Sequence, residues 1–223
     1  MTPYYSDDHV TIYHGDCRDI DGWIAADVIV TDPPYGIGWK RGKGTGPKMS
    51  RHGHAGIAND HDTSCRDDAL ARVPDKPALV FGSFYAPPPA GVRQVLVFHK
   101  GDTQGVIGAV HGYRRDVEPI YLCGPWPLRT IEWSSVVRSH RRVWNDELAA
   151  TGHPHTKPRD LIMTLITRCP PGVIADPFMG SGTTLRAAKD LGRKAIGVEL
   201  DERYCEIAAR RMGQEVLDLG AVS

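Results

Sequence analysis

Short apolar runs recur along the chain, and each run ends in a polar or glycine-containing turn. The runs cover residues 10–14, where apolar and polar residues alternate, and residues 27–30, 78–82, 95–98, 118–123, 173–175 and 195–199. Apolar runs of this length are typical of buried strands. Helical patterns lie at 18–25, 64–72, 158–168 and 202–212, and a further helix is expected after the glycines that precede Thr183. The alternation of the two patterns predicts an α/β sheet with helices on both faces.

A carboxylate, two prolines and an aromatic ring follow the strand expected at 27–30. Their sequence is Asp32-Pro33-Pro34-Tyr35, and open α/β sheets place their ligands at the carboxyl ends of the strands. The prolines fix two φ angles and remove two backbone donors, so the carbonyls here can face a ligand. The same residues also suit an ordinary turn at the end of a strand, because aspartate and proline are common in turns.

A second strand end, far along the chain, is followed by a glycine-rich turn. The strand expected at 173–175 leads into Asp176-Pro177-Phe178-Met179-Gly180-Ser181-Gly182-Thr183-Thr184. Glycines at such a turn let the backbone approach a ligand closely. A phosphate-binding loop is the main alternative, but the lysine that follows the last glycine of such loops is missing here. The turn therefore favours a cofactor without a triphosphate.

Together, the two stretches resemble the amino-group DNA methyltransferases, which use S-adenosylmethionine. The order along this chain, with Asp32-Pro33-Pro34-Tyr35 before the turn that begins at Asp176, is similar to the permuted "beta" arrangement of that family. The resemblance implies a Rossmann-like methyltransferase fold with a mixed, mostly parallel sheet of seven strands and helices on both faces. It also implies a single methyltransferase domain over residues 1–223.

The tetrapeptide carries the catalysis in this family, so the resemblance implies a catalytic site made of Asp32, Pro33, Pro34 and Tyr35. An exocyclic base amine is a poor nucleophile, because its lone pair is delocalised into the ring. If the Asp32 carboxylate and the Pro33 carbonyl accept its two N–H bonds, the lone pair is aimed at the methyl group. Such preorganised acceptors also stabilise the positive charge that develops on nitrogen. Tyr35 would then stack on the base after its extrusion from the duplex.

The cofactor that the resemblance implies is S-adenosylmethionine. Glu199 ends the second strand of a βαβ unit, where nucleotide-binding folds hold ribose hydroxyls. Asp176 would meet the methionine amino group, and Asp16 the adenine edge. Lys157, in a segment similar to the family's H-P-x-x-K-P-x-x-L, would contact the methionine carboxylate or face solvent. The residues expected to bind the cofactor are Asp16, Cys17, Asp32, Lys157, Asp176, Phe178, Gly180, Ser181, Gly182, Thr183, Thr184, Glu199 and Leu200.

Two basic stretches are expected to contact DNA. Residues 36–58 form a glycine-rich loop with no acidic residue between Lys40 and Arg51, and such a loop suits phosphate contacts. Residues 124–152 interleave arginines with tryptophans and fall where permuted members carry a target-recognition segment, although the segment is short here. Charge runs are also common on solvated faces. The residues predicted to contact DNA are Lys40, Arg41, Lys43, Arg138, Arg141 and Arg142.

The activity that the resemblance implies is site-specific methylation of adenine N6 in DNA. The tetrapeptide begins with Asp32, whereas cytosine-N4 members more often carry serine there. N4-cytosine methylation is the first alternative. A catalytically silent DNA-binding module is the second, and the intact motifs at both ends of the mechanism disfavour it. Protein-glutamine methyltransferases carry Asn-Pro-Pro-Tyr after the cofactor turn, so both residue identity and order disfavour that class.

Composition limits the class of protein. The 223 residues include 27 basic and 27 acidic side chains, so overall charge argues neither for nor against nucleic acid. The five cysteines form no C-x-x-C pair and the histidines at 52–61 lie in a polar stretch, so no metal is expected. No apolar run has the length of a membrane span and no signal pattern is present, so we expect a cytoplasmic protein without a membrane partner. DNA is the expected partner, while a homodimer and a cognate restriction enzyme stay open.

Overall fold

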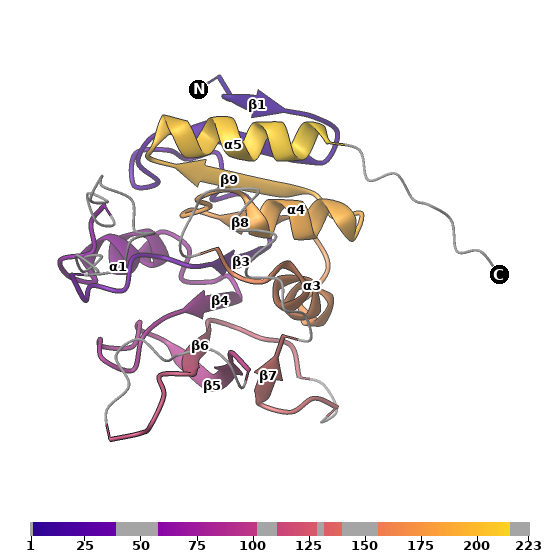
Figure 1. Cartoon of the computed structure of the whole chain (residues 1–223). Helices are drawn as coiled ribbons and strands as arrows, with labels where there is room; N and C mark the ends of the chain where they lie inside the picture. The colour runs from indigo at the N-terminus through magenta and orange to yellow at the C-terminus, as the bar shows by residue number, and fades with distance from the viewer. Residues whose placement is uncertain (1, 39–57, 102–110, 129–131, 140–155, 215–223) are drawn as a thin grey trace, which may run out of the picture. The chain divides into compact units, whose positions relative to one another are not determined.

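The computed structural model describes residues 2–38, 58–101, 111–128, 132–139 and 156–214 (Figure 1). The chain forms two compact units, one from residues 1–30 and 140–223 and the other from residues 31–139. The described residues contain nine strands rather than the expected seven. All seven apolar runs form strands, and the two additional ones are the short β1 (Tyr5–Ser6) and β7 (Val136–Arg138). The single methyltransferase domain stays a prediction.

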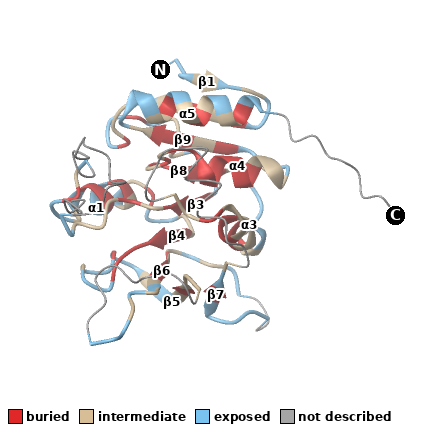
Figure 2. Cartoon of the chain, in the orientation of Figure 1, coloured by how far each residue is buried: buried red, intermediate tan, exposed pale blue. Residues whose placement is uncertain are grey.

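The sheet of the first unit is parallel except at one edge. Its order is β1, β2 (Val10–His14), β9 (Ala195–Glu199), β8 (Ile174–Asp176) and β3 (Val28–Thr31), whose last residue begins the second unit. β1 is antiparallel to β2, and the remaining neighbours are parallel. Central parallel strands are buried on both faces, which explains why β3 and β8 consist mainly of apolar residues, whereas burial alternates along β2. Figure 2 shows β8 buried along its length.

Three helices form a layer against this sheet. They are α3 (Arg159–Arg168), α4 (Thr183–Asp190) and α5 (Glu202–Gly213). α4 packs on β8 and β9, α5 packs on β2 and β9, and α3 packs against α4. The helix predicted at 158–168 is confirmed by α3, whose buried residues recur at helical spacing: Leu161, Ile162, Leu165 and Ile166. The side chain of Asp201 caps α5 by accepting the Arg203 N–H at 2.9 Å.

The second unit combines one helix with a mostly antiparallel sheet. Its elements are α1 (Ser64–Ala71), β4 (Ala78–Phe81), β5 (Val92–His99), β6 (Val117–Cys123) and β7. β6 lies between β4 and β5 and is antiparallel to both, and β7 runs parallel to β5. β5 begins at Val92, three residues before the expected run at 95–98, and the sequence did not indicate this extension because it contains the exposed polar residues Arg93 and Gln94. Exposed strands do not give a continuous apolar signal.

The helix expected at 18–25 is absent, and the chain forms successive turns there. Backbone bonds run from Asp19 N to Asp16 O and from Ile24 N to Asp21 O, each 3.0 Å. The Asp16 carboxylate accepts the Arg18 N–H at 2.9 Å, and such side-chain bonds compete with the helical ladder. The prediction of a helix at 18–25 was therefore wrong.

One carboxylate joins the amino-terminal segment of the first unit to α4. Asp7 accepts hydrogen bonds from Lys189 Nζ at 2.6 Å, from the Tyr5 hydroxyl at 2.8 Å, and from the backbone N–H groups of His9 and Val10 at 2.8 and 2.7 Å. Burial works to raise the pKa of Asp7, but these hydrogen bonds, chiefly the one from Lys189, outweigh it and hold the pKa well below its ordinary value.

We expect Asp7→Ala to lower the free energy of unfolding by about 2 kcal/mol, the scale of a hydrogen bond to a charged group. Because the folded-state pKa is depressed, the stabilisation is present above the unfolded-state pKa of about 4 and is lost as pH falls below it. Denaturant unfolding of both proteins between pH 7 and pH 3 should therefore show the difference shrinking. Asp8→Ala, at an exposed neighbour, is the control. A difference that does not change with pH would contradict this role of the charge.

Candidate functional site

Three acidic residues lie at the same edge of the first unit, where neighbouring parallel strands end. Asp176 is the last residue of β8, and Glu199 is the last residue of β9. His14 ends β2 opposite Glu199, and Asp16 follows two residues later. The amide of the intervening Gly15 donates to the carbonyl of Glu199 at 2.9 Å. Carboxyl ends of parallel strands are where open α/β sheets bind ligands.

Hydrogen bonds from the glycine-rich turn reach the carboxylates of β8 and β9. The Phe178 N–H donates to Asp176 Oδ1 at 3.1 Å, and the Gly180 N–H donates to Glu199 Oε2 at 2.9 Å. The Met179 N–H donates to the carbonyl of Val198 at 3.0 Å. Asp176 is only 2% exposed, so its carboxyl group is enclosed within the structure. Turn and strand ends therefore form one rigid structure.

Glu199 is held through both of its oxygens. Gly180 bonds to Oε2, and the Asp201 N–H donates to Oε1 at 2.8 Å. Burial raises the pKa of Glu199, and the amide donors act against that rise without cancelling it. Each carboxylate oxygen can accept a further hydrogen bond. The fixed carboxylate is therefore suited to bind a pair of ligand hydroxyls.

Gly182, the residue before α4, is a position of the turn where a side chain is poorly tolerated. Its φ is +80°, in the left-handed region that favours glycine. A Cβ at this position would lie 2.9 Å from Cβ of Ala208 in α5. Glycine therefore permits both the turn and the close packing of α5.

We expect Gly182→Ala to lower the free energy of unfolding more than Gly192→Ala. Gly192 also has a positive φ, +68°, but a Cβ there meets nothing within 4 Å. Left-handed backbone costs a non-glycine residue about 1–2 kcal/mol at either position, and overpacking adds about 1–3 kcal/mol at Gly182 alone. Denaturant unfolding of the two variants measures the difference. An equal decrease in the free energy of unfolding in both variants would show that α5 accommodates the methyl group added at residue 182.

Arg211 of α5 supports the turn and was not identified from the sequence. Its Nη1 donates to the Ser181 carbonyl at 2.7 Å, to Ser181 Oγ at 3.3 Å and to Thr183 Oγ1 at 3.4 Å. Ser181, Thr183 and Thr184 are buried. The hydroxyls of Ser181 and Thr183 therefore already serve the fold, and cofactor contacts from these three residues stay predictions.

The remaining cofactor-site predictions in this unit fall in different environments. Asp16 is bound by Arg18, whose Nη2 and Nε donate at 2.7 and 3.0 Å, and this bond lowers the pKa of Asp16. Cys17 is buried, and its carbonyl accepts the indole N–H of Trp23 at 2.9 Å. Leu200 is exposed after β9. Lys157 lies half-buried just before α3.

The predicted catalytic tetrapeptide belongs to the second unit and directly follows β3. The Tyr35 hydroxyl donates to Asp32 Oδ1 at 2.8 Å. Burial raises the pKa of Tyr35 well above its ordinary value, and the neighbouring carboxylates of Asp32 and Glu118 raise it further. The phenol therefore keeps its proton and can continue to donate. Lys100 Nζ in turn pairs with Glu118 Oε1 at 2.6 Å, which extends this polar cluster from β6 to the residue that follows β5.

A buried aspartate fixes the chain after the tetrapeptide. Asp60 is 4% exposed, and its Oδ1 accepts the Gly36 N–H at 2.8 Å. Its carbonyl accepts the Gly38 N–H at 2.6 Å. Gly36 has φ +72°, and a Cβ there would lie 2.5 Å from the carbonyl carbon of Asp62. This anchor was not predictable from a local motif, because it depends on a contact between segments 24 residues apart along the chain.

Most of the residues predicted to contact DNA lie outside the described residues. These are Lys40, Arg41, Lys43, Arg141 and Arg142. Arg138 is described, and it is exposed at the end of β7. The ring nitrogen of Trp126, in the same predicted segment, donates to the Cys123 carbonyl at 2.9 Å and so serves the fold.

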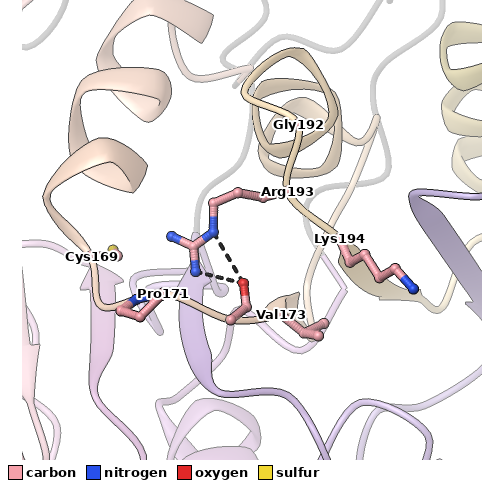
Figure 3. A pocket seen from close by; sticks show the side chains of 7 residues that line it. Cys169, Pro171, Val173, Gly192, Arg193 and Lys194 are labelled. Atoms are coloured by element: carbon pink, nitrogen blue, oxygen red, sulfur yellow. Dashed lines mark hydrogen bonds between the residues drawn. The ribbon is translucent and has the colours of Figure 1, made fainter.

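A shallow pocket of about 530 Å³ lies at the opposite, amino ends of β8 and β9 (Figure 3). Its one guanidinium belongs to Arg193, whose Nη2 donates to the carbonyls of Gly172 at 2.6 Å and Pro170 at 2.8 Å. Nη1 donates to the carbonyl of Ile166 at 3.3 Å. These bonds stabilise the turn after α3, so the Arg193 guanidinium is already engaged by backbone carbonyls. The edge that carries Asp16, Asp176 and Glu199 is therefore the better candidate site.

The described residues show neither a metal centre nor a membrane-spanning helix. No group of three or more histidine, cysteine, aspartate or glutamate side chains is placed to hold a metal ion there. Within the same ranges, no helix is both long and apolar enough to cross a membrane. His52 and His54 of the polar stretch lie outside these ranges, and His61 is within them.

Comparison with known proteins points to one family. The family model described as DNA methylase matches residues 110–210. The putative methylase YubD of Escherichia coli (strain K12) is 31% identical over 237 residues, which cover 94% of this chain and 93% of that protein. The type II methyltransferase M.ScaI of Streptomyces caespitosus is 44% identical over 71 residues, 31% of this chain. This match covers only 23% of the length of M.ScaI.

Solved structures share the fold. The PvuII DNA methyltransferase (cytosine-N4-specific) superposes with a TM-score of 0.63 over 96% of this chain and 90% of that chain, with 17% sequence identity. At this identity the likeness shows the fold alone. It confirms the fold class expected from the sequence.

Proposed function

The chain belongs to the DNA methylase family, and on that premise we propose that it transfers a methyl group from S-adenosylmethionine to an amino nitrogen of a base in DNA. The observation that carries the proposal is the hydrogen bond from Gly180 to Glu199, which joins the glycine-rich turn to the acid at the next strand end. This combination is suited to a nucleoside cofactor. The lysine of a triphosphate-binding loop is absent from the turn.

The cofactor is S-adenosylmethionine, and its sulfonium supplies an electrophilic methyl group. Glu199 accepts the ribose hydroxyls, because its carboxylate is fixed by two amides and still has lone pairs to offer. The buried carboxyl group of Asp176 would hold the cationic methionine amino group. Asp16 is held by Arg18 with its charge retained, and it lies where the adenine edge is expected.

Asp32 and the carbonyl of Pro33 accept the two N–H bonds of the base amine. The Tyr35 hydroxyl donates to Oδ1 of Asp32, and a carboxylate oxygen can accept more than one hydrogen bond. Because Tyr35 keeps its proton, Asp32 receives a fixed donor and is oriented before the base arrives. Preorganisation of this kind is the main source of electrostatic catalysis. The face of Tyr35 stacks on the extruded base.

We propose adenine N6 as the acceptor, on the strength of Asp32 at the start of the tetrapeptide. N4-cytosine methylation is the second candidate, because the PvuII enzyme, whose fold is shared, is cytosine-N4-specific. The exposed Arg138 is available for DNA phosphates, as phosphate contacts are made by exposed cations. Contacts from Lys40, Arg41, Lys43, Arg141 and Arg142 are predicted from the sequence.

The test is to supply labelled S-adenosylmethionine and DNA, digest the product to nucleosides and identify the methylated one. We expect N6-methyladenine, whereas N4-methylcytosine would replace the leading proposal by the alternative. Calorimetry on the same protein should show binding of S-adenosylmethionine and none of ATP. ATP binding without S-adenosylmethionine binding would overturn the assignment of the turn.

A further inference from the structure

The loop that follows β4 exposes two adjacent aromatic rings. Phe84 is 56% exposed and Tyr85 is 71% exposed. Aromatic side chains stabilise folds and interfaces when they are buried, and each can bury about 150–250 Å². Exposed apolar surface that is concentrated at one place indicates contact with a partner.

This loop is held firmly at both ends. The Gly82 N–H donates to the Pro119 carbonyl at 3.1 Å, and the Tyr85 N–H donates to Ser83 Oγ at 3.1 Å. Farther along, the carbonyl of Pro87 accepts Arg66 Nη1 at 2.9 Å, and Arg66 is buried. The run Pro87-Pro88-Pro89 further restricts the backbone. The exposure of the two rings is therefore built into the loop.

The positively charged side chain of Arg115 lies next to one of the two rings. The guanidinium carbon of Arg115 lies 4.8 Å from the centre of the Tyr85 ring, and residues 82–91 contain no charged side chain. The neighbouring Arg114 pairs with Asp116 at 3.4 Å. Among the described residues no acidic partner of Arg115 is found, so its charge is available to an anion. An aromatic ring stacked with a guanidinium suits a nucleic-acid base and its phosphate.

The loop lies at the same edge of the second unit as the catalytic tetrapeptide. Phe81, the last residue of β4, pairs with Ile120, two residues after Glu118. Glu118 is the carboxylate that lies against the Tyr35 phenol. The hydrogen bond from Gly82 to Pro119 starts the aromatic loop one residue from that contact.

We propose that Phe84, Tyr85 and Arg115 form a stacking surface for an unpaired base of the DNA substrate. This inference rests on the proposed function, because extrusion of a target nucleotide leaves bases without a partner. An unpaired base gains stacking on Tyr85 or Phe84 whatever its identity, and Arg115 meets the adjoining phosphate. The surface therefore raises the affinity of the protein for a duplex that contains an unpaired base, and it does so independently of the base sequence.

The test uses the full chain with S-adenosylhomocysteine and two duplexes, one fully paired and one with a single unpaired 2-aminopurine. We expect tighter binding to the second duplex and quenching of its fluorescence. Tyr85→Leu, which keeps an apolar side chain but removes the ring, should weaken this binding roughly tenfold. Tyr85→Phe should retain it. Tyr4→Leu, at a tyrosine that is 39% exposed in the first unit, is the control and should bind like wild type.

Salt dependence separates stacking from charge. Tyr85→Leu should leave the slope of log affinity against log salt unchanged, whereas Arg115→Gln should reduce it by about one. Unchanged affinity in Tyr85→Leu and Phe84→Leu, or equal weakening in Tyr85→Leu and Tyr85→Phe, would overturn the stacking surface. Methyl transfer by the wild type is measured in parallel. If transfer occurs and the leucine variants bind normally, this inference fails while the proposed function stands.

Discussion

Replacing Asp32 with alanine should abolish methyl transfer to DNA and leave most of the cofactor affinity, although Asp32 is itself among the residues expected to contact the cofactor. The acids and the turn assigned to the cofactor, Asp16, Asp176, Glu199 and residues 177–182, belong to the first unit and make their hydrogen bonds there. The Asp32 carboxylate instead accepts a hydrogen bond from the base amine in the proposed mechanism. Loss of one preorganised hydrogen-bonding group costs on the order of 3 kcal/mol of transition-state stabilisation, a rate loss of at least about a hundredfold.

Asp32→Asn is the sharper variant, because the amide keeps the size and one acceptor but loses the charge. We expect severe yet incomplete loss of transfer, measured with labelled cofactor under single-turnover conditions. Asp75→Ala, at an exposed aspartate of the same unit, is the control and should retain full activity. Full transfer by Asp32→Ala would refute the mechanism. Loss of cofactor binding in that variant would show that Asp32 serves mainly to hold the cofactor and not the base amine.

Replacing Glu199 with glutamine should weaken S-adenosylmethionine binding by at least about tenfold. Both carboxylate oxygens accept backbone N–H groups, from Gly180 and Asp201. The amide of glutamine can satisfy only one of them, and its NH₂ group opposes the other. The ribose hydroxyls then lose an acceptor, and one hydrogen bond to a charged group contributes about 1.5–3 kcal/mol. Calorimetry measures the change in dissociation constant.

The pH dependence adds a second test of Glu199. Burial raises its pKa, so protonation begins at a higher pH than for an ordinary glutamate. Cofactor affinity should therefore fall on acidification in the wild type and change less in Glu199→Gln. Glu202→Gln, at an exposed position in the first turn of α5, is the control. Equal affinity in Glu199→Gln and Glu202→Gln would remove Glu199 from the cofactor site.

The fold was predictable where burial on both faces leaves a continuous apolar signal. The seven runs seen in the sequence all form strands, and α3 and α5 lie where the helical pattern places them. β1 and β7 were missed because they have only two and three residues, too few for any periodicity. The helix expected at 18–25 failed because aspartate side chains and the Trp23 indole bind the backbone and favour turns.

Only those site residues that lie in contiguous sequence motifs were predictable. The tetrapeptide at Asp32 and the turn from Asp176 are contiguous motifs, so their residues could be named from the sequence. The residues that hold them come from elsewhere: Asp60 fixes Gly36, and Arg211 fixes Ser181. These residues are separated by 24 and 30 positions from their partners. No short motif contains such pairs.

The order of strands in the first unit has a consequence for synthesis on the ribosome. β2 and β3 are made early, yet β9 and β8, which lie between them in the sheet, come from the carboxyl-terminal half of the chain. Among the described strands, β2 can until then pair with β1 alone. Open strand edges invite pairing with other nascent chains, and distant partners slow folding. The sheet of the first unit is therefore completed only once β8 and β9 have been translated, and until then the edge of β2 that β9 covers stays open.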